Sequence, residues 1–137
     1  MMRYVFDACA LVAFFNDEDG ADAVEELLFR ASEGHCTIIM NKYNLLEVYY
    51  GYLRANGEEF AENILNIVEN SNINICDILT DTLFRQAGKF KTSYRVSLAD
   101  SMALAQASVE QATLVTTDHH ELDVIERDGK LKFHWLR

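Results

Sequence analysis

The sequence contains no proline, only three cysteines and no long run without charged residues. The longest stretches that lack Asp, Glu, Lys and Arg are Ala8–Asn16 and Ser101–Val109, each nine residues long. A membrane-spanning helix needs about 20 apolar residues, so we expect no membrane insertion. The first residues, MMRYVFD, lack the apolar core and the cleavage site of a secretory signal, and we therefore expect a cytoplasmic protein.

The cysteines form no recognisable disulfide or metal-binding motif. Cys9, Cys36 and Cys76 are odd in number, contain no CxxC pair and stand among apolar residues. Cysteine is also among the residue types that are most often buried in protein cores. We therefore expect three reduced thiols in the core.

Basic residues are scarce as well. Twelve Lys and Arg against 22 Asp and Glu leave a net charge of -10, which disfavours a broad nucleic-acid-binding face. The imbalance lies in residues 1–81, with fifteen acids and four bases, whereas residues 82–137 have seven acids and eight bases. An excess of acid can also reflect carboxylates gathered around a divalent metal. One stretch without acids, Thr82–Ala99, is either a solvated helix face or a surface for phosphates; its bases are Arg85, Lys89, Lys91 and Arg95.

Half of the 137 residues are hydrophobic, and no linker or repeat interrupts them, which predicts one domain over residues 1–137. Strand-like runs alternate with helical segments of ten or more residues, which requires crossover connections between parallel strands. The pattern therefore predicts a three-layer α/β/α sandwich with a parallel four- or five-stranded sheet. The runs are Tyr4–Phe6, Cys36–Met40, Ile73–Cys76, Thr113–Thr116 and Leu131–Trp135.

Apolar residues recur at helical spacing in five segments between these runs. We expect each apolar stripe to face the core of the protein. The stripes are Val24, Leu27, Leu28 and Ala31; Leu46, Tyr49, Tyr50 and Leu53; Phe60, Ile64, Ile67 and Val68; Leu83, Ala87 and Phe90; and Leu98, Met102, Ala105 and Val109.

Four acidic residues stand where burial is expected. Asp7 and Asp118 end predicted strands, Asp100 opens an alanine-rich helix, and Glu47 is the only charge in its helical run. Each has an ordinary alternative, since the aspartates can cap helices and Glu47 can face solvent. However, strand ends and the helix starts that follow them meet at one edge of a parallel sheet, so we expect Asp7, Asp100 and Asp118 at that edge and three or four carboxylates to converge there. Converging carboxylates repel one another unless a divalent cation neutralises them, and oxygen ligands suit Mg²⁺ or Mn²⁺. Phosphodiester hydrolysis is the reaction that such a site serves best.

The order and setting of four segments, FDACALVAFF, NLLEVYYGY, SLADSMALAQA and LVTTD, resemble a PIN domain. They are most similar to the small single-domain kind found in VapC-like toxin ribonucleases of toxin–antitoxin pairs, and the resemblance covers nearly the whole chain. It implies an α/β/α sandwich, Mg²⁺- or Mn²⁺-dependent cleavage of RNA, and a catalytic, metal-binding site at Asp7, Glu47, Asp100 and Asp118. It also implies a homodimer and a cognate antitoxin protein as partner, with the bases of Thr82–Ala99 as candidates for contact with RNA.

Two positions beside these acids extend the comparison with the family. The family often has a hydroxyl residue two positions after the first acid, whereas this chain has Cys9. Thr116 stands two positions before Asp118 and matches the family pattern. We expect its hydroxyl to orient a carboxylate or a water molecule next to the metal, unless it is an ordinary strand threonine.

Three other functions fit parts of the pattern. A PIN-like domain without catalysis would serve as a protein-binding or scaffold module, which Cys9 and the acidic balance favour. A receiver-like phosphoacceptor domain also has acids at strand ends, but it needs a lysine after a late strand, and Thr113–Asp118 supplies none. The run DHHELD could bind zinc, although the adjacent His119 and His120 would point in different directions on a helix.

Overall fold

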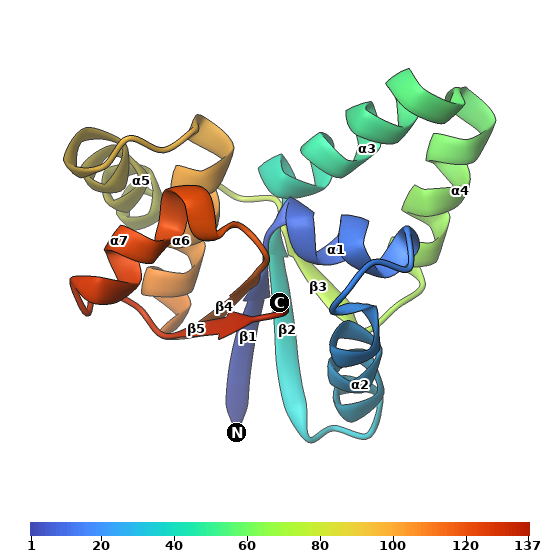
Figure 1. Cartoon of the computed structure of the whole chain (residues 1–137), viewed down its shortest axis with the longest axis horizontal. Helices are drawn as coiled ribbons and strands as arrows, with labels where there is room; N and C mark the ends of the chain where they lie inside the picture. The colour runs from blue at the N-terminus through green and yellow to red at the C-terminus, as the bar shows by residue number, and fades with distance from the viewer.

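The computed structural model describes all of residues 1–137 and contains five strands and seven helices (Figure 1). The strands are β1 (Met2–Phe6), β2 (Cys36–Asn41), β3 (Ile73–Cys76), β4 (Thr113–Thr116) and β5 (Phe133–Trp135). The helices are α1 (Ala8–Phe15), α2 (Ala21–Ser32), α3 (Lys42–Asn56), α4 (Glu58–Glu69), α5 (Asp81–Ser93), α6 (Leu98–Glu110) and α7 (His119–Arg127). The five predicted strands are confirmed to within two residues at each end. No helix has both the length and the hydropathy of a membrane-spanning segment.

The five strands form one parallel sheet in the order β3-β2-β1-β4-β5. In the centre, Tyr4 of β1 pairs with Ile38 of β2 on one side and with Thr113 of β4 on the other. Because all strands run the same way, their carboxyl ends lie at one edge of the sheet, next to the starts of α1 and α3 (Figure 1). The predicted fold, an α/β/α sandwich on a parallel sheet, is confirmed with five strands.

Helices cover both faces of the sheet, and alternate residues of each strand point to opposite layers. Tyr4 and Phe6 of β1 pack with α1, α2, α3 and α4 in one core. Val5 packs with α5, α6 and α7 in the other core. Figure 1 shows the same division, with α5, α6 and α7 on one side of the sheet and the first four helices on the other. The middle of α6 is buried almost all round, which holds its first turn firmly at the edge of the sheet.

The stripe predicted for α3 was wrong. Leu46 and Tyr50 are 49% and 42% exposed, and the buried apolar side of α3 consists of Leu45, Val48 and Tyr52. This helix has apolar residues on more than one face, so spacing alone does not identify the face that packs. The stripes of α2 and α5 are confirmed, whereas four outer members of the α4 and α6 stripes are exposed: Phe60, Ile67, Leu98 and Val109.

Polar side chains fix the helix starts at the carboxyl edge of the sheet. Asn41 caps α3 by accepting a hydrogen bond from the Tyr43 N–H at 2.8 Å, and its amide donates to Gln106 of α6 at 3.0 Å. Asn44 donates to the Ala99 carbonyl at 2.9 Å. These buried bonds connect β2 and α3 to α6, and so set the spacing of two walls of a pocket at this edge.

Candidate functional site

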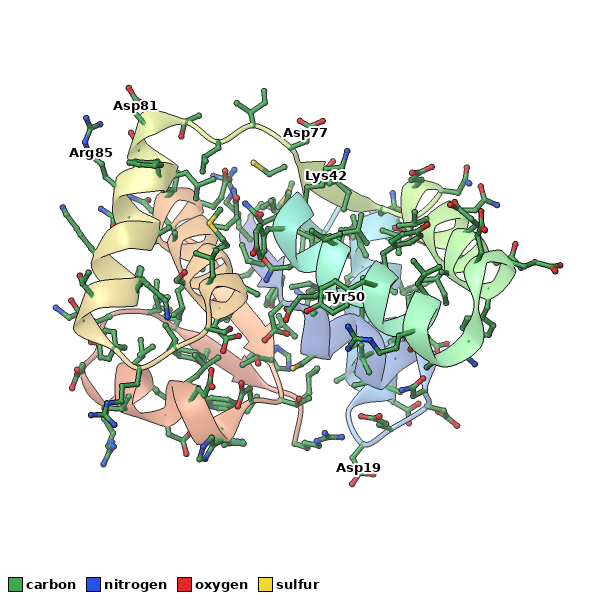
Figure 2. All side chains as sticks on the ribbon, turned by 90° about the horizontal axis from the view of Figure 1, so that it is seen from above. Asp19, Lys42, Tyr50, Asp77, Asp81 and Arg85 are labelled. Carbon is green, nitrogen blue, oxygen red and sulfur yellow. The ribbon has the colours of Figure 1, made fainter.

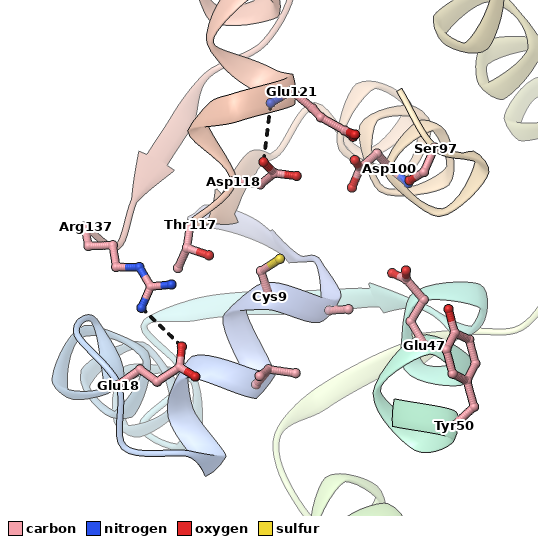
Figure 3. Close-up of a pocket in the computed structure, with 12 residues that line it drawn as sticks. Cys9, Glu18, Glu47, Tyr50, Ser97, Asp100, Thr117, Asp118, Glu121 and Arg137 are labelled. Carbon is pink, nitrogen blue, oxygen red and sulfur yellow. Dashed lines mark hydrogen bonds and ion pairs between the residues drawn. The ribbon is translucent and has the colours of Figure 1, made fainter. Parts of the chain in front are cut away.

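A pocket of about 480 Å³ opens at the carboxyl edge of the sheet (Figure 3). Three of the four predicted acids line it: Glu47 from α3, Asp100 from α6 and Asp118 from the turn before α7. The fourth, Asp7, directly precedes the lining residue Ala8. The other polar residues in the lining are Cys9, Glu18, Tyr50, Ser97, Thr117, Glu121 and Arg137.

Asp7 joins the end of β1 to the start of α1 and is only 2% exposed. Its Oδ1 accepts a hydrogen bond from the Ala10 N–H at 3.0 Å, so it caps α1. Its Oδ2 is buried and has no hydrogen-bond partner. Burial is the main reason that the pKa of Asp7 is raised to about 7. The Thr116 side chain and the Ala10 N–H oppose this rise by hydrogen bonding, and the charges of Asp118 and Glu47 add to it. A buried carboxyl oxygen without a partner is costly, and a cation is one way to satisfy it.

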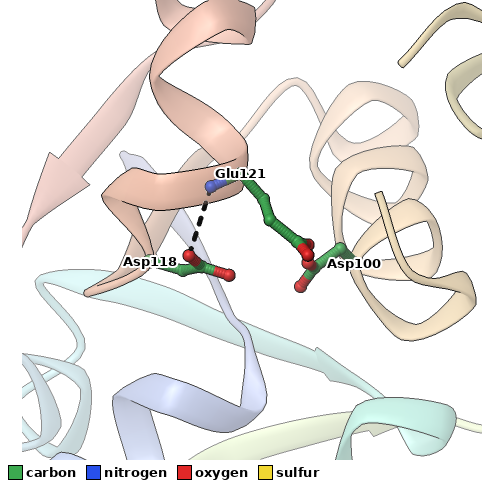
Figure 4. Close-up of side chains that lie close together, drawn as sticks. All are labelled: Asp100, Asp118 and Glu121. Carbon is green, nitrogen blue, oxygen red and sulfur yellow. Dashed lines mark hydrogen bonds between the residues drawn. The ribbon is translucent and has the colours of Figure 1, made fainter. Parts of the chain in front are cut away.

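Asp100, Asp118 and Glu121 form a close carboxylate group, in which one oxygen of each lies within 4.8 Å of the others (Figure 4). Asp118 caps α7 by accepting a hydrogen bond from the Glu121 N–H at 3.3 Å, and Asp100 stands in the first turn of α6, capped by Ser97. Burial, a hydrogen bond with Glu121 and the charges of Glu121 and Asp118 raise the pKa of Asp100 to about 8. The same hydrogen bond lowers the pKa of Glu121. Without a cation, Asp100 therefore favours its protonated form below about pH 8 and shares that proton in a hydrogen bond with Glu121.

Glu47 faces this group from the opposite wall of the pocket (Figure 3). Its side chain is half-buried, and burial is the main reason that its pKa is raised, with the charge of Glu121 second. Glu47 therefore points into the pocket, in contrast to the alternative that it faces open solvent. Neither Glu47 nor Asp7 belongs to the close group of three, so the carboxylates surround the pocket and do not all meet at one point.

Glu121 was not predicted as a site residue. Its backbone N–H donates the capping hydrogen bond to Asp118. Its carboxylate, however, turns toward Asp100, which the sequence places 21 positions earlier. Thr116 was predicted to orient a neighbour: it is fully buried, and its Oγ1 accepts a hydrogen bond from the Asp118 N–H at 3.1 Å.

The prediction of three core thiols was wrong for two of them. Cys36 is buried, but Cys9 and Cys76 are only partly buried. Cys9 is the second residue of α1, and its thiol points into the pocket because the apolar side of this short helix packs elsewhere (Figure 3). Burial and the charge of Asp7 raise the pKa of Cys9 to about 12, so the thiol stays protonated.

The histidines of DHHELD do not join the carboxylates. The ring of His119 stacks on Trp135 with 3.8 Å between centroids, and its nitrogens bond Asp123 at 2.8 Å and the Arg137 carbonyl at 2.6 Å. His120 is exposed. No histidine belongs to a group of three or more potential metal ligands, so the structure gives the zinc alternative no support.

The four bases predicted to meet phosphates all lie on or just after α5, and none lines the pocket. Figure 2 shows Arg85 on the outer side of α5. Lys91 donates a hydrogen bond to the Val96 carbonyl at 2.6 Å, and its charge contributes to the lowered pKa of Glu121. Of the four, Lys91 therefore has the clearest electrostatic link to the site.

The acidic groups in and beside the pocket offer carboxylate oxygens, one of which is buried without a partner, and the one sulfur in the pocket, the Cys9 thiol, stays protonated. Oxygen-only sets suit hard divalent cations such as Mg²⁺ and Mn²⁺ better than Zn²⁺ or copper. A cation would also offset the burial and the repulsion that together raise three of the carboxyl pKa values, burial being the larger cause in each. The residues present therefore fit a divalent metal, and the class is an α/β/α protein with an acidic site at the carboxyl edge of a parallel sheet.

Comparisons with known proteins identify the family. The PIN domain model matches residues 4–127, and the chain therefore belongs to the PIN domain family. A comparison with curated protein sequences finds no significant match.

Solved structures share the fold across nearly the whole chain. VapBC2 from Rickettsia felis, bound to a DNA fragment from its promoter, has a TM-score of 0.73 at 22% identity and covers 97% of this chain and 98% of its own. DNA-bound VapBC from Salmonella typhimurium has a TM-score of 0.72 at 17% identity, with 100% of both chains covered. VapC20 from Mycobacterium tuberculosis, a toxin that cleaves the sarcin–ricin loop, has a TM-score of 0.66 at 15% identity. The match covers 85% of this chain and 91% of the VapC20 chain.

Proposed function

We propose that this protein is a divalent-metal-dependent endoribonuclease and the toxin of a toxin–antitoxin pair. The observation that carries the proposal is the ring of carboxylates around one pocket, together with the buried, unpartnered oxygen of Asp7, which directly precedes the lining residue Ala8 and feels the charges of Asp118 and Glu47. Membership of the PIN domain family and the shared fold with toxin structures support the same conclusion.

Asp7, Glu47, Asp100 and Asp118 would hold Mg²⁺ or Mn²⁺, with Glu121 as a fifth carboxylate. When bound, such a cation supplies charge stabilisation at a phosphate and activates water near neutral pH. Asp100 and Glu121 share a proton that must leave before both carboxylates can act as ligands. Thr116 keeps the backbone of Asp118 in place, and the cap on α1 fixes the carboxyl of Asp7.

The proposal is tested by incubating RNA with the purified protein in Mn²⁺, in Mg²⁺ and in EDTA. We expect cleavage only with the metals, and its loss in Asp100→Asn, while Asp22→Asn, an exposed acid on α2, keeps full activity. Circular dichroism checks that the variants keep their fold. Cleavage in EDTA, or by Asp100→Asn at the wild-type rate, would disprove the metal-site mechanism. If the alternative function is correct and the protein is a scaffold module, calorimetry should detect no Mn²⁺ binding that depends on Asp7.

The toxin role also predicts growth arrest when the protein is expressed alone in a bacterial host. The several toxin–antitoxin complexes among the similar structures support an antitoxin partner for this chain. We expect the wild type, but not Asp100→Asn, to stop growth, and co-expression of the antitoxin to restore it. Equal arrest by both proteins would contradict a toxicity that depends on cleavage.

We also propose a homodimer. Exposed apolar side chains gather where α3 begins and where the chain enters α5: Tyr43, Ile78 and Leu79 line one groove, and Phe84 follows at 63% exposure. Figure 2 shows the beginning of α3 at Lys42 beside the segment at Asp77. Light scattering should give about twice the 15.7 kDa chain mass. Phe84→Asp should give the monomer mass, whereas Phe29→Asp, an equally exposed phenylalanine on α2, should not; a monomeric wild type would refute the proposal.

A further inference from the structure

The pocket contains a single basic residue. Of the 12 residues that line it, five are acidic and only Arg137 is basic. RNA carries a negative charge at every phosphate, so the acids alone would repel the strand that the proposed function brings to this place. Arg137 stands on the side of the pocket formed by Thr117 and Glu18 (Figure 3).

Two hydrogen bonds hold the backbone in place at Leu136 and Arg137. The N–H of the preceding residue, Leu136, donates to the Thr116 carbonyl at 3.0 Å, and Leu136 itself is buried. The carbonyl of Arg137 bonds the ring of His119 at 2.6 Å, and that ring is stacked on Trp135. The residue is therefore preorganised beside the start of α7, which carries Asp118 and Glu121.

The guanidinium of Arg137 has hydrogen-bonding capacity to spare. Its Nη1 donates to Glu18 at 3.1 Å, and both side chains are more than a third exposed. The structure gives this guanidinium no other hydrogen-bond partner, although an arginine has five N–H donors. A guanidinium can form two parallel bonds to a phosphate, and an exposed pair with a carboxylate contributes little to stability.

We propose that Arg137 binds a backbone phosphate of the RNA at the edge of the carboxylate site, and that Glu18 holds the guanidinium over the pocket when RNA is absent. This inference rests on the proposed function, because it takes RNA as the substrate. It assigns the phosphate contact inside the pocket to Arg137, whereas the bases of α5 lie outside the pocket.

The test compares Arg137→Gln with three matched variants. Arg137→Lys keeps the charge, Glu18→Gln breaks the ion pair from the other side, and Arg127→Gln removes an exposed arginine at the end of α7. Steady-state cleavage of a short single-stranded RNA of mixed sequence is measured with Mn²⁺. Binding of the same RNA, fluorescently labelled, is measured as a function of salt in the Asp100→Asn background, which is expected to leave the RNA intact.

Loss of one charge-assisted hydrogen bond predicts that Arg137→Gln lowers kcat/KM and RNA affinity about tenfold. It should also make the slope of log affinity against log salt shallower by about 0.7, because one phosphate contact is lost on a single strand. We expect Arg137→Lys to keep the wild-type slope and Arg127→Gln to keep kcat/KM within about twofold. Glu18→Gln frees the guanidinium and removes a negative charge from the pocket, so it should keep or raise the RNA affinity.

Two results would overturn the inference. Equal losses in Arg137→Gln and Glu18→Gln would mean that the pair only fastens the chain after β5, and an unchanged salt slope in Arg137→Gln would mean that no phosphate contact was lost. Failure of the proposed function gives a different result, since the wild type itself would then not cleave RNA in Mn²⁺.

Discussion

Replacing Asp7 by asparagine removes an ionisable group next to the pocket while keeping the shape of the side chain. Asparagine caps helices as well as aspartate does, so the Ala10 N–H keeps an acceptor. The new amide nitrogen takes the place of the unpartnered Oδ2. Its burial costs about 1–3 kcal/mol, and this cost is the same at every pH.

The charge has an effect that does depend on pH. The pKa of Asp7 rises from 3.8 to about 7 in the folded protein, so between these values the folded protein keeps a proton that the unfolded chain has lost. The metal-free wild type is therefore favoured at low pH, and its free energy of unfolding falls as the pH rises through this window. The full window corresponds to roughly 4 kcal/mol, and the part between about pH 5 and pH 8 to about 2–3 kcal/mol. Asparagine does not titrate, so the free energy of unfolding of Asp7→Asn lacks this decrease with rising pH.

Urea unfolding in EDTA at the two ends of that pH range measures how the stabilities of the wild type and Asp7→Asn differ in their pH dependence. We expect the free energy of unfolding of the wild type to fall by about 2–3 kcal/mol more than that of Asp7→Asn. Asp100 titrates in both proteins and therefore largely cancels in the comparison. At the higher pH, saturating Mn²⁺ should stabilise the wild type by about 3 kcal/mol and leave Asp7→Asn unchanged. An identical pH dependence of the two proteins in EDTA would refute the argument that the carboxyl of Asp7 is buried at an energetic cost.

Three further predictions follow from the same structure. In calorimetry, Mn²⁺ affinity should rise about tenfold or more between about pH 6 and pH 8. The reason is that Asp7 and Asp100, with pKa values of about 7 and about 8, must lose protons to bind the ion. An affinity that does not change with pH would contradict this. Glu121→Gln removes a charge that raises the pKa of Asp100. The midpoint of the pH dependence of Mn²⁺ affinity should therefore move down by about one pH unit. An unchanged midpoint would count against a proton shared between Asp100 and Glu121. Gly20→Ala should lower the free energy of unfolding in urea by about 2–4 kcal/mol, and Gly34→Ala by about 1 kcal/mol. Both glycines have positive φ, but only at Gly20 would a Cβ meet another side chain, at 2.6 Å. Equal losses would disprove the steric argument.

The sequence predicted the sheet because its strands are short, apolar and clearly separated by helical segments. Asp7 and Asp118 could be placed at the pocket for the same reason, since the end of a parallel strand has a fixed location in the fold. The packed face of α3 was mispredicted because that helix has apolar residues on two sides, and only contact with α4 and the sheet decides between them.

Other parts of the site depend on distances that spacing does not encode. Glu121 contacts Asp100 because α6 and α7 lie side by side, an arrangement that depends on the packing of both helices against the sheet. Arg137 reaches the pocket only because β5 pairs with β4 and the following residues turn toward Glu18. A lone arginine 19 positions after Asp118 carries no local signal of that return.

The central position of β1 has a consequence during synthesis. This strand, with Asp7 at its end, leaves the ribosome well before its neighbour β4 and the helix that carries Glu121, which lie more than a hundred residues later in the chain. Until then one edge of β1 has no partner, and only part of the carboxylate ring exists. A nascent chain that lacks α7 therefore cannot complete the ring of carboxylates, and the proposed ribonuclease would stay inactive toward the messenger and ribosomal RNA around it until that helix has been made.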